Sequence, residues 1–282
     1  MIWAIINTFL DSIADVLYKK ALSISDIKSM IFQFTGEILA IPIVIVLIFI
    51  FDFNLKLFLD PTIFGGFVVM TIFFLLGNNL GQYLYKNEKL STLLPYFKIN
   101  SFIVVILGFL FFKDASLISF LICIGAIILT TIFSIDYKDY TAPKNSFKII
   151  LHEIFKTIEY LIAIYILKNV SSVEYVILYQ VYYSIVVLLI IAFQKDFKEF
   201  KKFNSHILKY RYMGYTLGFT SYFIDIFLLK EYGVIILTLF GFICSSLTIV
   251  IAYFFLKEVP EKKEIILGVL VTILAGVGYY FK

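Results

Sequence analysis

Residues 84–114, LYKNEKLSTLLPYFKINSFIVVILGFLFFKD, decide the fold of this chain, because their pattern returns 144 residues later. The second copy is residues 228–258, LLKEYGVIILTLFGFICSSLTIVIAYFFLKE. Without a gap, Lys86 aligns with Lys230, and the two lysine–acid pairs that end the apolar runs also align. Seven of the 31 aligned positions are identical. Matched charged ends at a fixed spacing predict two copies of one unit.

The composition indicates that this unit lies in a membrane. The 282 residues are 61% hydrophobic, with a mean hydropathy of +0.97, and only 16% are charged, whereas soluble domains average about 25%. The net charge of +4 is small, and most lysines stand between apolar runs, which argues against a nucleic-acid surface. Two cysteines inside apolar runs and two histidines predict no disulfide framework, no metal site and no cofactor.

Ten segments of the chain are long and apolar enough to be transmembrane helices, which need about 20 mostly apolar residues. We therefore expect an all-α membrane protein with ten transmembrane helices. The expected repeats are residues 1–134 and 146–282, joined by a linker at residues 135–145. Each repeat has an odd number of helices, so the second is inverted, and inverted repeats of this kind build transporters with the substrate between the halves. The ten spans are approximately residues 1–18, 29–51, 62–85, 90–112, 116–134, 146–167, 173–193, 208–229, 232–256 and 262–281.

The lysines and arginine predict an orientation. Seventeen of them flank the connections after the odd-numbered spans, and five flank the opposite side. Because cytoplasmic loops carry the excess of such charges, we expect an integral protein of the cell membrane with both termini outside. The connection at residues 193–211 is the most basic, and we expect it to be a solvated cytoplasmic loop.

The first span carries a polar stripe. Asn7, Asp11, Asp15 and Lys19 are each four residues apart, which places them on one helix face. An ionisable side chain in hydrocarbon is costly unless it faces a partner or a wet cavity. Asp11 or Asp15 would therefore bind a cation or carry a proton in a cavity wall. Alternatively, Asp15 pairs with Lys19 near the membrane surface.

Six further spans supply the other candidate residues for substrate binding or coupling. Each also has a structural explanation, since buried amides bond to neighbouring helices and acids can pair with lysines inside the bundle. Lys98 would form a buried ion pair or anchor an anionic group, and Asp225 would line the site or reach towards Lys230. These candidates are Glu37, Asn78, Asn79, Gln82, Tyr96, Lys98, Asn100, Glu159, Gln180 and Asp225.

Three local patterns accompany the ten spans. The first span runs into a basic end at residues 14–22, ADVLYKKAL; a charged turn follows the fourth span of each half; and the fifth span of each half contains a glycine, Gly125 or Gly268. In these features the chain resembles the EamA-type transporters of the drug/metabolite transporter superfamily. The resemblance implies ten helices in an inverted repeat and the import or export of small metabolites. It also implies cytoplasmic termini, opposite to the orientation that the lysines predict.

These patterns favour a secondary transporter that moves a small polar metabolite by alternating access. Six acids inside the spans outnumber two lysines there, which favours a cationic or zwitterionic substrate, proton coupling, or both. The expected partners are this substrate, membrane lipid and a proton, without nucleic acid. A flippase for a lipid-linked substrate and a non-transporting membrane partner are alternatives. An intramembrane enzyme is disfavoured because GxGD and GxSxG motifs are absent, and ATP is disfavoured as the driver because no GxxxxGK[ST] loop occurs.

Overall fold

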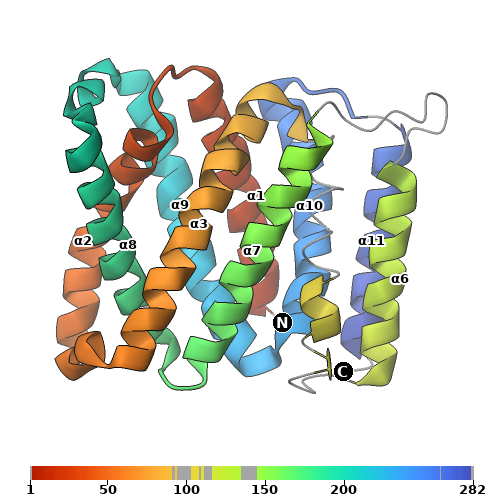
Figure 1. The fold of residues 1–282 in the computed structure, drawn as a ribbon. Coiled ribbons are helices and arrows are strands. Elements are labelled where there is room, and N and C mark those ends of the chain that lie inside the picture. The colour runs from red at the N-terminus through yellow and green to blue at the C-terminus, as the bar shows by residue number, and fades with distance from the viewer. Residues whose placement is uncertain are drawn as a thin grey trace.

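The computed structural model describes residues 2–90, 93, 103–107, 109–110, 116–134, 145–260 and 262–280. Within these residues all regular secondary structure is helical (Figure 1). The elements are α1 (Ile2–Ser23), α2 (Ser29–Ile50), η1 (Leu55–Leu59), α3 (Pro61–Asn87), α6 (Leu117–Ser134), α7 (Ser146–Leu167), α8 (Ser172–Gln194), η2 (Asp196–Lys202), α9 (Ser205–Tyr232), α10 (Val234–Leu256) and α11 (Lys262–Tyr280).

The helices coincide closely with nine of the predicted spans, and the span predicted at residues 90–112 falls mainly outside the described residues. The largest differences are at α1, which continues to Ser23, and at α9, which already begins at Ser205. Within the described part of the chain, α2, α3, α8 and α10 are each long and apolar enough to cross a membrane.

Polar side chains fix where several helices begin. Asp60 caps α3 by accepting hydrogen bonds from the backbone N–H groups of Thr62 and Ile63, at 2.9 and 3.0 Å. Ser171 and Glu174 form a capping box at the start of α8, and Asn204 accepts from the Ile207 N–H at the start of α9. These bonds satisfy the N–H groups that the first turn of a helix leaves unpaired.

The bundle is arranged in helix pairs. α2 packs on α8, and α6 packs on α11. Figure 1 shows these two pairs at opposite edges of the bundle. Between them, α1 packs mainly on α9 and α10, and α3 packs on α7. Gly214 allows the close approach of α1 and α9, since a Cβ there would lie 3.3 Å from the Tyr18 backbone nitrogen. α1 begins and α11 ends at the same end of the bundle (Figure 1).

The outside of the bundle is apolar. Large side chains such as Phe49 and Phe193 are 79% and 85% exposed, and many other exposed Ile, Leu and Phe residues lie along the helices. A soluble monomer rarely exposes contiguous apolar surface on this scale. Together with the four helices that are able to cross a bilayer, this surface is that of an all-helical membrane protein.

Candidate functional site

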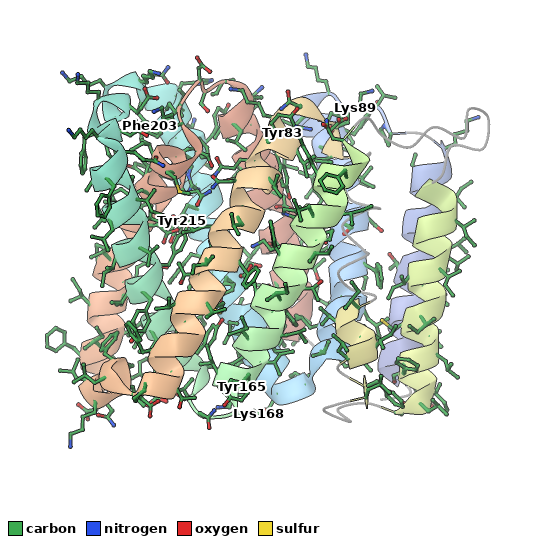
Figure 2. The ribbon with its side chains drawn as sticks, in the orientation of Figure 1. Tyr83, Lys89, Tyr165, Lys168, Phe203 and Tyr215 are labelled. Carbon is green, nitrogen blue, oxygen red and sulfur yellow. The ribbon has the colours of Figure 1, made fainter. Side chains whose placement is uncertain are left out.

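A cavity of about 460 Å³ lies inside the bundle. Six helices line it: α1, α2 and α3 from the first half of the chain, and α7, α8 and α9 from the second. Figure 2 shows Tyr215, one of the lining residues, between the helices and nearer to the end marked by Phe203, Tyr83 and Lys89 than to the end marked by Tyr165 and Lys168. The cavity therefore sits off centre, towards the end of the bundle where α1 ends and α2 begins; this end carries Lys19, Lys28 and Lys86 and is called the lysine-rich end below.

The α1 wall carries Asp11 and Asp15, which lie one turn apart and are both half-buried. Asp15 accepts a hydrogen bond from the Tyr85 hydroxyl at 3.3 Å, and Asp11 accepts one from the Cys244 thiol at 3.3 Å. Lys19 forms an ion pair with Glu258, with 2.7 Å between Nζ and Oε1. The polar stripe of α1 thus divides between an acidic cavity wall and a buried ion pair at the helix end.

The wall formed by α2, α8 and α9 centres on Glu37. Its carboxylate accepts hydrogen bonds from the Gln180 amide and from the Tyr215 hydroxyl, the latter at 2.7 Å. One turn earlier on α2, the Gln33 oxygen accepts a 2.6 Å hydrogen bond from Tyr183. Three helices are joined here by a network of buried polar side chains.

Arg211 falls in both the predicted loop at residues 193–211 and the predicted span at residues 208–229. It lies inside α9, as the span predicts, but it is only 4% exposed and lines the cavity, so the prediction of a solvated position is wrong. Its Nε and Nη2 groups donate to the backbone oxygens of Phe32 and Gln33 at 2.8 and 3.0 Å. Its guanidinium carbon also lies 4.9 Å from the centre of the Phe32 ring and 5.2 Å from that of Tyr215. One feature of the sequence could have pointed to Arg211 as a special residue: it is the single arginine in a chain whose other basic residues are lysines and two histidines.

Gly36 is needed beside Arg211. A Cβ at this position would overlap the Tyr215 ring and lie 2.7 Å from the Arg211 Cζ atom. Because position 36 is a glycine, the Arg211 and Tyr215 side chains of α9 can lie directly against α2.

The wall formed by α3 and α7 holds both acids and bases. His152 is hydrogen-bonded to Glu153, and Lys156 forms an ion pair with Glu159, with 2.8 Å between Nζ and Oε2. Lys156 also lies 4.1 Å above the centre of the Phe74 ring. On α3, the Gln82 side chain is buried and lines the cavity.

The structure brings together six of the residues that the sequence proposes for the site, and these are Asp11, Asp15, Glu37, Asn78, Gln82 and Gln180. Two others lie outside the cavity wall: Asn79 accepts a hydrogen bond from the Ser29 hydroxyl, and Glu159 pairs with Lys156. Tyr96, Lys98 and Asn100 lie outside the described residues.

Asp225 lines a second, smaller cavity of about 210 Å³. Its carboxylate accepts a hydrogen bond from the Asn7 amide, and the Asn7 oxygen accepts one from Ser221 at 2.8 Å. The alternative prediction was that Asp225 reaches towards Lys230. Lys230 instead donates to the Val170 backbone oxygen at 2.6 Å. Asp11 lines both cavities, so it stands between them.

Aromatic residues line part of the larger cavity. Tyr175, Tyr179 and Tyr183 stack along one face of α8, with ring centroids 6.3 and 5.8 Å apart. The Tyr222 hydroxyl donates to the Tyr175 hydroxyl at 3.3 Å. Tyr175 is fully buried in the main apolar core, so the stack runs from the cavity wall into packed protein.

Chemically, the cavity offers carboxylates, amides and tyrosine rings in a space large enough for a small metabolite. Such a mixture of a few placed polar groups and aromatic walls is typical of small-molecule sites. Within the described parts of the chain, no three His, Cys, Asp or Glu side chains are grouped to hold a metal ion.

Comparison of the sequence with models of protein families and with curated proteins finds no match to either.

Proposed function

We propose that this chain is a secondary transporter of the EamA type, which moves a small cationic or zwitterionic metabolite across the cell membrane by alternating access. The observation that carries the proposal is the polar cavity inside an apolar bundle. Its six lining helices are the first three predicted spans of each half, so the substrate would bind at the interface between the halves, where inverted-repeat transporters bind theirs.

The pairing of helices supports an inverted repeat of residues 1–134 and 146–282. Exchanging the halves would turn α1 into α7 and α9 into α3, and both α1–α9 and α3–α7 are extensive contacts. The same exchange would leave the pairs α2–α8 and α6–α11 unchanged, and both of these pairs also exist. A two-fold relation between the halves accounts for all four contacts, and it would allow one half to rock against the other.

The charges in the cavity wall support a substrate with a positive group. Asp11, Asp15, Glu37 and Glu153 supply four acids. Against them, Lys156 is paired with Glu159, and Arg211 adds one positive charge, which its hydrogen bonds to backbone oxygens do not neutralise. An excess of acid attracts a cation, and an acid that faces a wet cavity in a membrane is suited to carry a proton.

The lysine-rich end of the bundle would face the cytoplasm, since Lys and Arg accumulate on that side. In this orientation both termini lie outside, and the cavity lies nearer to the cytoplasm. The resemblance to EamA-type transporters implies the opposite placement of the termini, and we propose the orientation that the charges support.

The test is a flux assay with the protein in lipid vesicles, using pooled radiolabelled amines and amino acids with and without a pH gradient. We expect uptake above that of empty vesicles, increased by the gradient. Asp15→Asn removes the proposed proton carrier, so gradient-driven uptake should be lost while the protein still folds. Asp26→Asn is the control, because Asp26 is exposed outside the cavity.

Two results would contradict the proposal. One is an Asp15→Asn variant whose gradient-driven uptake is as fast as that of the unmodified protein. The other is movement of a lipid-linked substrate in the same vesicles while no soluble solute moves, which would identify a flippase instead.

A further inference from the structure

The connection between α8 and α9 repeats a pattern every three residues. Its sequence at 195–203 is KDFKEFKKF, and most of it forms the 3₁₀ helix η2. Side chains three residues apart eclipse one another in such a helix. The segment therefore presents three rows of side chains, which are Lys195, Lys198 and Lys201; Asp196, Glu199 and Lys202; and Phe197, Phe200 and Phe203.

The phenylalanine row attaches η2 to α2. Phe200 meets the Phe34 ring edge to face, with ring centroids 6.2 Å apart, and Phe203 stacks on Phe32 at 6.4 Å. Phe197 stacks on Phe200 at 6.3 Å but stays 51% exposed. The row is thus held by the bundle at one end and leaves an apolar ring uncovered at the other.

The second row holds both acids of η2, and both have partners. Asp196 is buried and forms an ion pair with Lys28 at the start of α2. Glu199 pairs with Lys202, with 2.8 Å between Oε1 and Nζ, and it also accepts a 3.4 Å hydrogen bond from the Lys28 backbone N–H. These contacts fix the rotation of η2 about its own axis.

The third row consists of exposed lysines. Lys195, Lys198 and Lys201 form no ion pair with any residue that the structure describes. Just before them, Phe193 is 85% exposed in the last turn of α8, which is one of the helices able to cross a membrane. Figure 2 shows Phe203, at the far end of the segment, at the lysine-rich end of the bundle. Three unpaired positive charges and uncovered aromatic rings therefore stand where α8 leaves the membrane.

We propose that η2 is a docking surface for anionic phospholipids of the surrounding leaflet. Their phosphate groups pair with the lysine row, while Phe193 and Phe197 lie against the adjoining ends of the acyl chains. Basic residues just outside a membrane-crossing helix attract anionic lipids, and apolar rings beside them anchor a segment in the interface. A soluble anion would satisfy the lysines but leave both rings in water, so a lipid accounts for more of the surface.

This inference goes beyond transport. It depends on the membrane location of the bundle and on the contacts of η2, and it uses no residue of the cavity. A protein that transports nothing could still bind lipid in this way, and a transporter could lack the lipid site.

The test uses tryptophan fluorescence of the full-length protein in phosphatidylcholine vesicles. The chain has a single tryptophan, Trp3, which is 58% exposed near the start of α1, at the end of the bundle away from η2. The double variant Trp3→Phe/Phe197→Trp moves this reporter to η2. Quenching by brominated phosphatidylglycerol or brominated phosphatidylcholine then gives the affinity of each lipid beside the reporter. At low salt we expect at least a tenfold preference for phosphatidylglycerol beside η2, because each lysine contributes about fivefold, and a clearly smaller preference beside Trp3.

Two pairs of substitutions, each made in the η2 reporter protein, separate the lysine row from net charge. Lys198→Gln with Lys201→Gln should reduce the preference to about fivefold or less, the contribution of Lys195 alone. Lys56→Gln with Lys168→Gln is the matched control, since it removes two exposed lysines at the opposite end of the bundle. The control should keep the full preference. High salt should weaken the preference of the unsubstituted reporter protein, because exposed charges are screened.

Three results would overturn the inference. Equal quenching by the two lipids beside η2 would show that the lysine row does not select anionic lipid, and so would a preference that survives replacement of Lys198 and Lys201. If neither lipid quenches the reporter at η2 while inorganic phosphate changes its fluorescence, the segment lies in water and its ligand is a soluble anion.

Discussion

At the scale of single residues, Arg211 shows best how this bundle holds its polar site. A guanidinium group is planar and donates in a fixed fork, which suits two neighbouring carbonyl oxygens on α2. Cation–π contacts with the rings of Phe32 and Tyr215 further stabilise the buried positive charge. One side chain thereby ties α9 to α2 beside Glu37.

Arg211→Met should lower the free energy of unfolding by about 2 kcal/mol or more, because it removes two charge-assisted hydrogen bonds. Arg211→Lys should recover only part of this loss, since an ammonium group lacks the fork. Thermal unfolding in detergent measures both variants, with Lys209→Met as the exposed control two residues earlier in α9. Equal stability of Arg211→Met and Lys209→Met would show that the buried contacts contribute nothing.

The residue types in the cavity were only partly predictable. Asp11, Asp15, Glu37, Gln82 and Gln180 are polar residues inside apolar spans, where a polar side chain needs a reason. Arg211 escaped notice because it follows a run of lysines, and neighbouring charges in sequence suggest a common loop. Tyr215 escaped notice because tyrosines also gather at membrane surfaces, and sequence alone does not separate the two positions.

At the scale of elements, close helix approach decides where these side chains go. α2 can lie against α9 because position 36 has no side chain, and α1 can lie against α9 because of Gly214. The sequence predicted the helices well, since long apolar runs between charged ends are a strong signal. It did not predict which helices pair, because an apolar helix face can pack on many partners. The choice of partner depends on how the side chains of the two faces fit together, and this fit is visible only in the folded structure.

Gly36→Ala should destabilise the fold and disturb the cavity, since the new methyl group would overlap Tyr215 and Arg211. We expect a loss of roughly 1–3 kcal/mol in unfolding free energy, the usual cost of overpacking. Gly65→Ala is the matched control, because nothing lies within 4 Å of a Cβ built there, and it should be neutral or slightly stabilising. The same thermal unfolding assay compares them, and a Gly36→Ala protein as stable as Gly65→Ala would contradict the packing described.

At the scale of the whole molecule, two similar halves would enclose one site. The aligned stretches at residues 84–114 and 228–258 predicted the duplication, and the odd number of spans in each half predicted the inversion. The second stretch belongs to α9 and α10, whereas about half of the first lies outside the described residues. The helix contacts related by exchange of the halves are the structural support for this architecture, and the buried pair of Lys19 and Glu258 joins the halves at the lysine-rich end.

The most direct test of the central claim is to block the cavity and measure flux. Gly218 lines the cavity, and a Cβ there would meet only Ala14, at 3.6 Å, so a phenyl ring at this position would extend into the free space. Gly125 has open space around it and lies on α6, away from the cavity. In vesicles, the unmodified protein and Gly125→Phe should move an amino solute faster than empty vesicles, while Gly218→Phe should fold normally and move none. A Gly218→Phe protein that transports as fast as Gly125→Phe would contradict the account.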